Sequence, residues 1–179
     1  EHRFENVMSY GFSKNGERLF YTASNKDGSA DGVYAVDVAS GQATSVLTGE
    51  GKYTQMVLDE DGERVAFLTN RDDWDADEPE FGLYVGGTLT VTASTAGVPD
   101  DWRINEHGSL SFSENGERLM FGTQPIPMPD PDDDILDEDQ VKLDVWNWRD
   151  PYIQPMQLVR ADDEKKRVYT AVLHLDENR

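Results

Sequence analysis

The sequence contains no cysteine among its 179 residues. Disulfide bonds, zinc–thiolate sites, iron–sulfur clusters and cysteine nucleophiles are therefore excluded. Basic residues are also scarce: 16 Lys and Arg stand against 36 Asp and Glu, which gives a net charge of −20 at pH 7 with histidine neutral. A chain this acidic lacks the basic face that binds nucleic acid or an anionic membrane surface. We therefore expect neither nucleic acid nor a membrane among its partners.

Long apolar runs and helical periodicity are missing as well. No apolar run approaches the roughly 18 residues of a membrane span, and the best helix pattern, Ile135–Val141, is short and acidic. The chain starts at Glu1 without Met and shows no signal peptide, which favours a processed or cut fragment of a longer parent. Apolar residues nevertheless make up 37% of the chain and aromatic residues 10%, enough to build a core.

The sequence does contain a threefold internal repeat. An apolar segment, an Asn-Gly or Asp-Gly turn, Glu-Arg and a second apolar segment recur at Phe12–Phe20, Leu58–Phe67 and Phe112–Phe121. The turn glycines at positions 16, 62 and 116 lie 46 and 54 residues apart. Asn-Gly or Asp-Gly between apolar runs favours a β-hairpin, because glycine readily adopts the positive φ of a tight turn. Repeats of this length, made of strands and turns, are typical of β-propeller blades.

The pattern predicts an all-β fold: a β-propeller fragment of about three four-stranded antiparallel blades, at residues 6–50, 51–106 and 107–179. The expected strands are Asn6–Phe12, Glu17–Ser24, Gly32–Val38 and Gln42–Leu47 in the first blade, Tyr53–Leu58, Glu63–Leu68, Phe81–Val85 and Thr88–Thr92 in the second, and Ser109–Ser113, Glu117–Thr123 and Val141–Trp148 in the third. A closed propeller has four to eight blades. Either a longer parent or self-association through the terminal blades is therefore expected, and the first is favoured.

The repeats are similar to the blades of TolB-like and prolyl oligopeptidase propellers. Three further segments resemble the N-terminal propeller of bacterial prolyl oligopeptidase-family (S9-like) serine peptidases: Asn70–Asp73, Lys142–Pro151 followed by Ile153–Gln157, and Tyr169–Leu175. The Asp-Val-Trp-Asn-Trp block at 144–148 is the most specific of them. The resemblance covers most of the chain.

The resemblance implies a non-catalytic segment that restricts substrate access and contacts an α/β-hydrolase domain, which would follow in the parent and is absent here. Its implied partners are that domain and the parent's peptide substrate, and the implied location is periplasmic or secreted. The sequence holds no G-x-S-x-G nucleophile elbow, so we expect no catalytic residue and no enzymatic activity in this chain. The alternatives are a TolB-like propeller that binds a protein partner, and a propeller enzyme acting on carbohydrate or a metal-assisted substrate.

Candidate cation ligands lie in one acidic loop. Asp73, Asp75 and Asp77 alternate as in a calcium loop, but the glycine and the glutamate that an EF-hand needs at positions six and twelve are replaced by Glu78 and Tyr84. No cofactor is expected, although clustered carboxylates suit a hard cation such as calcium in an irregular site. The sequence favours the alternative, a solvated acidic loop. Asn25–Gly32 is interpreted as a turn, and His2, His107 and His174 are too scattered in sequence to indicate a shared site.

The remaining candidates are contact residues. Trp74 and Trp102 lie near charged turns and are expected to be exposed, whereas Trp146 and Trp148 alternate along a predicted strand and are expected in the core. The insert Gln124–Gln140 is rich in proline and includes Asp130, Asp132, Asp133 and Asp134. Two interpretations stay open: a functional loop that acts as a lid or contact, and a mobile loop without a function. The segments 71–80 and 124–140 together carry −12 of the net charge of −20, which predicts an acidic rim. Arg18, Arg64 and Arg118 recur at one repeat position and are expected to pair with acids between blades.

Overall fold

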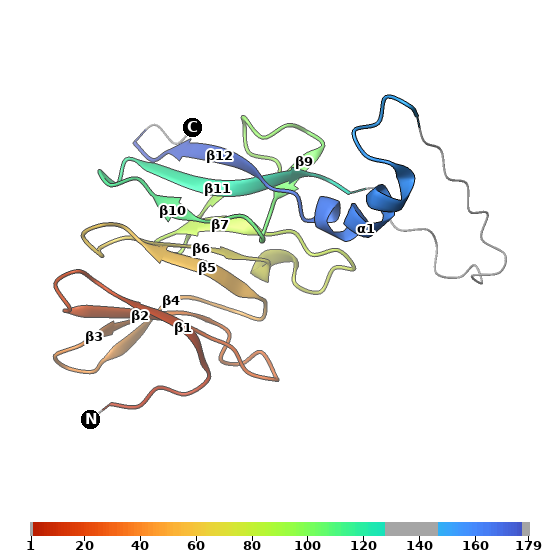
Figure 1. The fold of residues 1–179 in the computed structure, drawn as a ribbon. Coiled ribbons are helices and arrows are strands. Elements are labelled where there is room, and N and C mark those ends of the chain that lie inside the picture. The colour runs from red at the N-terminus through yellow and green to blue at the C-terminus, as the bar shows by residue number, and fades with distance from the viewer. Residues whose placement is uncertain (1, 128–146, 177–179) are drawn as a thin grey trace. The chain divides into compact units, whose positions relative to one another are not determined.

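A computed structural model of the chain describes residues 2–127 and 147–176. The chain divides into two compact units, Glu1–Pro125 with Val168–Arg179, and Ile126–Arg167. The first unit is built of β-strands, and the described part of the second contains one α-helix (Figure 1). Within the described residues, no helix is both long and apolar enough to cross a membrane.

Three antiparallel sheets of four strands each make up the first unit. The first sheet contains β1 (Val7–Phe12), β2 (Arg18–Ala23), β3 (Gly32–Asp37) and β4 (Ala43–Thr48); the second contains β5 (Tyr53–Leu58), β6 (Val65–Thr69), β7 (Gly82–Val85) and β8 (Thr88–Val91); the third contains β9 (Trp102–Ile104), β10 (Ser111–Phe112), β11 (Arg118–Pro125) and β12 (Tyr169–His174). In the first two sheets, spatial order follows chain order. The predicted all-β fold with three four-stranded antiparallel blades is confirmed.

The third sheet differs from the prediction in its first strand. β11 pairs with β12 along one edge, and with both β9 and β10 along the other. β9 therefore belongs to the third sheet, although the predicted boundary placed Trp102–Ile104 within the second blade. Between β9 and β10 the chain stays close beside β11, since a Cβ on Gly108 would lie 2.5 Å from the Cα of Gly122. The repeat motif begins only at β10, so nothing local in the sequence indicated that β9 pairs with β11.

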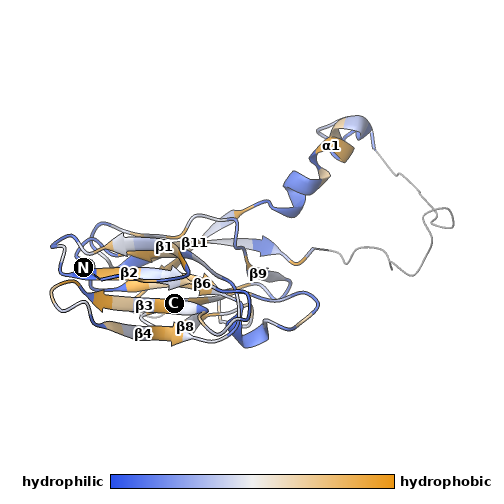
Figure 2. Cartoon of the chain, turned by 90° about the horizontal axis from the view of Figure 1, so that it is seen from below, coloured by the Kyte–Doolittle hydropathy of each residue, from blue (hydrophilic) through white to orange (hydrophobic). Residues whose placement is uncertain are grey.

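The core lies on both faces of the second sheet. Phe67 and Val65 of β6 pack with Phe20 and Val33 of the first sheet. Leu68, Ala66 and Leu83 pack instead with residues of the third sheet, including Leu119, Phe121 and Leu173. Strand alternation sends neighbouring β6 side chains to opposite faces, and both faces are covered, which explains why β6 is a continuous apolar run rather than an alternating one. Figure 2 shows the hydrophobic colouring concentrated on the strands and the hydrophilic colouring in the connections.

The three repeat turns share one hydrogen-bonding scheme. The turn glycines have φ of 72°, 71° and 67°, as the Asn-Gly and Asp-Gly signals predicted. Before each turn a polar side chain accepts a hydrogen bond from the backbone N–H five residues later: Ser13 from Arg18 at 2.9 Å, Asp59 from Arg64 at 3.0 Å and Ser113 from Arg118 at 3.0 Å. The three turns lie on the same side of the sheets, at the left of Figure 1. This scheme gives the repeated residues their physical role.

The second unit contains a helix that the sequence analysis missed. α1 (Gln154–Lys165) begins after Ile153, with Pro155 in the first turn, where no backbone N–H is needed for an intrahelical hydrogen bond. None of its residues is buried, so its sequence lacks the apolar stripe by which an amphipathic helix is predicted. The predicted strand Val141–Trp148 is not found at its described end: residues 147–150 form a turn, and the side chain of Trp148 is 84% exposed rather than in the core. Trp146 and the helix pattern Ile135–Val141 lie outside the described residues.

Candidate functional site

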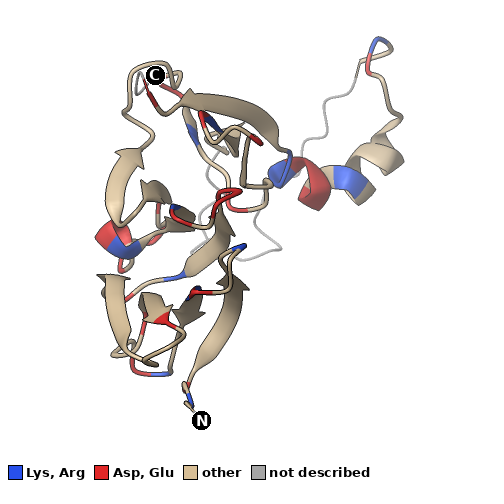
Figure 3. Cartoon of the chain, turned by 90° about the vertical axis from the view of Figure 1, so that its left-hand side faces the viewer, with Lys and Arg blue, Asp and Glu red and all other residues tan. Residues whose placement is uncertain are grey.

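The candidate site is built on the loop that joins β6 to β7 in the second sheet. β6 ends at the buried Thr69, the 3-10 helix η1 (Arg71–Asp73) turns the chain, and the loop returns at Gly82. The loop residues 71–80 carry six acids and one arginine. In Figure 3 the charged residues of the first unit lie mainly in turns and loops, while its strands are mostly free of charge. The loop thus places a strong negative charge beside a buried strand end.

Arg71, Asp72 and Tyr84 form a hydrogen-bonded network at the base of the loop. The Arg71 guanidinium donates to Asp72 Oδ1 from Nη2 at 2.7 Å and from Nε at 2.9 Å, and Tyr84 donates its hydroxyl hydrogen to Asp72 Oδ2. The hydrogen bond from Tyr84, followed by that from Arg71, lowers the pKa of Asp72. Burial and the Asp72 carboxylate raise the pKa of Tyr84, so its hydroxyl stays protonated as the donor. The network ties the loop to β7.

Arg71 also reaches the segment that links the first sheet to the second. Its Nη1 donates to the carbonyl oxygen of Thr48 at 3.3 Å. A Cβ on Gly49 would lie 2.8 Å from Arg71 Cδ, and one on Gly51 would lie 2.9 Å from Arg71 Cα. Both glycines have positive φ, 139° and 147°, so the linker needs them for its conformation and for its close approach to Arg71. Burial raises the pKa of nearby Tyr53 to about 12, although the charge of Arg71 acts to lower it.

A cavity of about 260 Å³ lies against this loop, and we call it the loop-end cavity. Its lining residues are Thr69, Asp72, Asp73, Glu80, Phe81, Gly82, Tyr84, Leu89, Thr92 and Ala93. All of them come from the second sheet, its loop, or the turn after β8. The cavity therefore combines apolar and aromatic walls with three carboxylates.

A second cavity, of about 420 Å³, lies at the opposite end, beside the repeat turns, and we call it the turn-end cavity. Phe12, Leu58 and Phe112, the last residues of β1, β5 and β10, line it together with residues of the three turns. Each repeat thus contributes the same position to one space.

Arg64 joins two of these turns. Its Nε donates to Asp59 at 2.8 Å, and its Nη2 donates to the carbonyl oxygen of Gly116 in the next blade at 2.7 Å. Its guanidinium also lies 5.7 Å from the centre of the Phe112 ring. Arg64 therefore bridges two blades through a backbone carbonyl, whereas the acid it pairs with, Asp59, belongs to its own blade; the predicted pairing with an acid of another blade is not found at Arg64.

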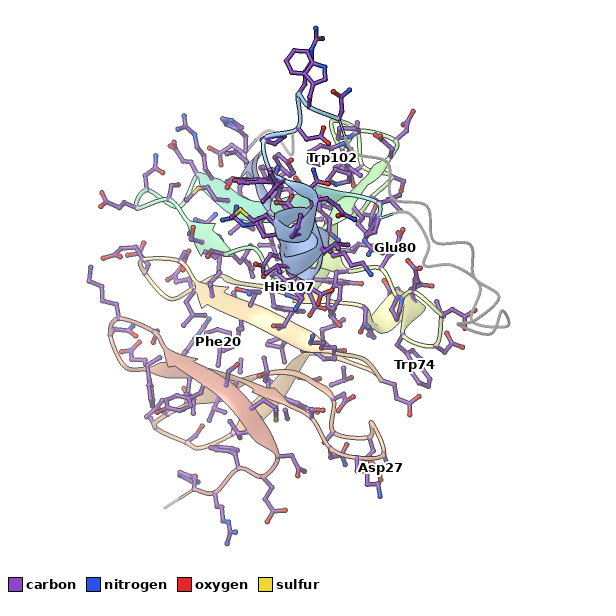
Figure 4. The ribbon with its side chains drawn as sticks, turned by 45° about the vertical axis from the view of Figure 1, so that its right-hand side comes forward. Phe20, Asp27, Trp74, Glu80, Trp102 and His107 are labelled. Carbon is purple, nitrogen blue, oxygen red and sulfur yellow. The ribbon has the colours of Figure 1, made fainter. Side chains whose placement is uncertain are left out.

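The predicted contact residues lie in different surroundings. The side chain of Trp74 is 47% exposed on the candidate loop, whereas Trp102 is half-buried and packs edge-on against Tyr169 at 4.9 Å (Figure 4). Asp130, Asp132, Asp133 and Asp134 lie outside the described residues. The acidic rim therefore stays a prediction: β6 and β11 each lead from a repeat turn into one of the two acidic segments, but most of the insert lies outside the described residues.

The candidate cation ligands remain a prediction. Asp73 Oδ2 accepts a hydrogen bond from the backbone N–H of Glu80 at 3.0 Å, while Asp75 and Asp77 are exposed. Across residues 2–127 and 147–176, no three His, Cys, Asp or Glu side chains are grouped so as to hold a metal ion. In the Asn25–Gly32 turn, the carboxylate of Asp31 is used by the backbone N–H groups of Asn25 and Gly51. The three histidines lie in the N-terminal tail, the β9–β10 connection and β12.

Nothing local in the sequence marks Tyr84, Gly82 or Leu89 as part of a site. Tyr84 is notable there only as a mismatch to a calcium loop, and Gly82 and Leu89 are ordinary strand residues. Asn70–Asp73 was noted as part of a family resemblance, and this was the available signal for Arg71 and Asp72. Without the pairing of β7 with β6 and β8, the sequence does not bring these positions together.

Comparison with known proteins identifies similar folds but no family. No protein-family model matches the sequence, and no curated protein matches it. Among solved structures, the chain is similar to the β-propeller domain of the Trilobed protease from Pyrococcus furiosus, with a TM-score of 0.45 and 11% identity over 66% of this chain and 35% of that one. It is also similar to TolB from Acinetobacter baumannii, with a TM-score of 0.44 and 14% identity over 68% of this chain and 28% of that one.

The chain spans about a third of the length of these solved structures. The identification of its three sheets as propeller blades rests on their own strand order and packing.

Proposed function

We propose that the chain is a non-catalytic propeller segment of a longer serine peptidase of the prolyl oligopeptidase type, where it restricts substrate access and contacts the hydrolase domain. A periplasmic or secreted location is part of this proposal. The proposal is supported by the blade repeats and by the resemblance of the segments at 70–73 and 142–157.

The observation that carries the proposal is the convergence of β1, β5 and β10, the strands that lead into the three repeat turns. β5 contacts both β1 and β10, so these three strands lie next to one another. In a propeller the blades surround a central channel. The apolar ends of these strands, Phe12, Leu58 and Phe112, together line the turn-end cavity. Such a lining suits a passage that an extended peptide can enter and a folded protein cannot.

The test begins with the parent reading frame and then uses the full-length protein. We expect a G-x-S-x-G motif followed by Asp and His downstream, turnover of proline-containing peptides by the full-length protein, and no turnover by residues 1–179 alone. Phe12→Ala and Phe112→Ala in the full-length protein should raise kcat/KM for long peptides relative to short ones. The exposed Val38, which does not line this cavity, provides the control variant Val38→Ala. A parent without a hydrolase region, or activity in residues 1–179, would contradict the proposal.

The alternative is a TolB-like propeller that binds a protein partner, and exposed apolar side chains on β1 favour it. The side chains of Met8 and Tyr10 are 71% and 69% exposed, and the Tyr10 and Phe12 rings pack edge to face at 6.2 Å. Large exposed apolar side chains in a group mark contact surfaces more often than isolated ones do. A reading frame that continues into further blades and ends without a hydrolase region would support this alternative.

A further inference from the structure

The loop-end cavity has the lining of a site for a long apolar stem. Phe81, Tyr84, Leu89 and Ala93 form its walls, and the Leu89 side chain is 44% exposed. Its volume of about 260 Å³ is below the roughly 300–1,000 Å³ of sites for whole small molecules. The cavity is therefore of a size for one side chain rather than for a complete metabolite.

Gly82 lets two wall residues of the cavity, Leu89 and Tyr84, lie directly against the backbone of β7. A Cβ at this position would lie 2.8 Å from Leu89 Cδ1 and 3.1 Å from Tyr84 Cε2, closer than side chains pack. Its φ is not in the left-handed region, so the backbone itself would accept an alanine. The present positions of Leu89 and Tyr84 in the cavity wall therefore depend on the absence of a side chain at position 82.

The carboxylates of the cavity differ in what they already bind. Asp72 is committed to Arg71 and Tyr84. Asp73 is held by the Glu80 backbone N–H, and the side chain of Glu80 is exposed. Asp73 and Glu80 therefore provide negative charge for a ligand, within a loop whose residues 71–80 carry a net charge of −5.

The aromatic wall already attracts a cation of this chain. The Lys52 ammonium lies 5.9 Å from the centre of the Phe81 ring while it is paired with Glu106. An ammonium or guanidinium group is attracted to the face of an aromatic ring, and the attraction strengthens as water is excluded. Phe81 thus lies in surroundings where positive charge is stabilised.

We propose that the loop-end cavity binds the side chain of a lysine or arginine of a polypeptide partner, with the stem against Phe81 and Leu89 and the cationic head between Asp73 and Glu80. Aliphatic stems cover apolar surface while their charged heads remain at the polar edge, which is the arrangement that this lining offers. The site is independent of the proposed peptidase role, because it needs neither the hydrolase domain nor the turn-end cavity.

The test is a titration of the chain with Nα-acetyl-lysine-N-methylamide, followed by NMR shifts of the Gly82, Thr92 and Ala93 amides. The norleucine analogue has the same stem without the charge, and the arginine analogue tests the second head group. We expect the lysine and arginine compounds to bind about tenfold more tightly than the norleucine compound, because hydrogen bonds between two charged groups are the strong class. Added salt should weaken binding of the two cations and leave the neutral compound unchanged.

Variants assign the binding to this cavity. Glu80→Gln and Asp73→Asn should each weaken lysine binding about fivefold to tenfold, and Gly82→Ala should abolish it, because the added methyl group would displace Leu89 and Tyr84 from the cavity wall. Glu78→Gln is the matched control, since Glu78 lies on the same loop but pairs with Arg103 at 3.5 Å and does not line the cavity; its effect should stay below twofold. A cooperative melting transition establishes that each variant is folded at the temperature of the titration.

Equal binding of the lysine and norleucine compounds, no shift at millimolar ligand, or equal losses in Glu78→Gln and Glu80→Gln would each overturn the proposal. None of these outcomes bears on the peptidase proposal, which is tested by turnover in the full-length protein.

Discussion

The two ends of the blades are built in opposite ways. At the turn end, the three repeats each have a glycine with positive φ, a polar acceptor at the same position and the same hydrogen bond to the backbone. In contrast, the connections from β2 to β3, from β6 to β7 and from β11 to β12 all differ: the first is a turn around Asp31, the second is the loop of the loop-end cavity, and the third includes α1. The turn end thus performs one structural task three times, whereas the loop end is where the blades differ and where a specific contact can be built.

The largest change in stability is expected from glycine substitutions at the turn end, which test whether the repeat turns also hold neighbouring blades together. Gly62→Ala and Gly16→Ala place a methyl group at the same turn position with nearly the same φ, 71° and 72°. At Gly62 the new Cβ would lie 2.4 Å from the Cα of Ser13 in the first sheet, whereas at Gly16 no atom lies within 4 Å. Backbone strain alone costs about 1–2 kcal/mol, and a clash with backbone adds about 1–3 kcal/mol. Gly62→Ala should therefore lower the free energy of unfolding by about 4 kcal/mol and Gly16→Ala by about 1 kcal/mol, as measured by urea denaturation.

Equal losses in the two variants would show that the second turn does not pack against the first blade. Gly116→Ala should fall between them, because the atom that its Cβ would meet is the movable Nη2 of Arg64.

The next effect concerns Asp59, the one acid among the three turn acceptors. Its carboxylate accepts from the backbone N–H groups of Glu63 and Arg64 and from the Arg64 side chain. Asp59→Ala leaves these donors without their acceptor and should lower the free energy of unfolding by about 3 kcal/mol. Ser13→Ala removes a neutral acceptor at the same position and should cost about 1 kcal/mol. Urea denaturation of both variants at pH 7 measures the difference. Equal losses of unfolding free energy would show that the Asp59 carboxylate contributes no more to stability than the Ser13 hydroxyl.

Asp59 also makes stability depend on acid. Burial acts to raise the pKa of Asp59, but the hydrogen bonds from Arg64 and Glu63 outweigh it and lower the pKa. A lowered folded-state pKa contributes stability that is present above the unfolded value of about 3.9 and is lost as the pH falls through the folded value. Asp59→Asn keeps an acceptor for the backbone but should flatten the loss of stability below about pH 4. A variant that loses stability in acid as steeply as the unaltered chain would contradict this assignment.

At the loop end the expected stability effects are smaller. Tyr84→Phe removes the hydroxyl that donates to Asp72 and should cost about 1 kcal/mol, because Asp72 keeps its Arg71 partner. The measurement is urea denaturation at pH 7, with Tyr34→Phe as the control, since the Tyr34 hydroxyl bonds only a backbone carbonyl, that of Ala30, at 3.2 Å. A loss of 3 kcal/mol or more, on the order of breaking a buried ion pair, would mean that the loop end is as important for folding as the turn end.

The smallest effect is expected at Trp74. Its side chain is 47% exposed on the candidate loop, so Trp74→Ala should change the free energy of unfolding by less than about 0.5 kcal/mol. The same substitution should weaken the binding of a polypeptide partner that contacts the loop. Comparing the two measurements separates a contact role of Trp74 from a role in folding. A large loss of stability would place Trp74 among the packing residues instead.

The repeats and turns were predictable because their signals are local. Asn15-Gly16, Asp61-Gly62 and Asn115-Gly116 specify positive φ within two residues, and most strands end within two residues of their predicted limits. The helix α1 was missed because its residues are exposed, so burial imposed no apolar stripe on the sequence. Trp148 was placed in the core because alternation with Trp146 suggested a strand, which its turn conformation contradicts. The pairing of β9 was missed because a three-residue strand carries too little pattern.

By itself, then, the sequence determined what short segments can specify: an all-β fold, three hairpins of one design, the concentration of acid in two connections, and the absence of a nucleophile elbow. The tertiary structure alone decided which side chains meet. Gly82, Leu89 and Phe81 enclose a space only because β7 pairs with β8 and the β6–β7 loop returns over them. Phe12, Leu58 and Phe112 share a cavity only because the sheets pack with β1, β5 and β10 adjacent. The physical reason is that the conformation of a turn depends on residues that are neighbours in the sequence. A cavity depends on packing between strands that are far apart in the sequence, and no short segment specifies that packing.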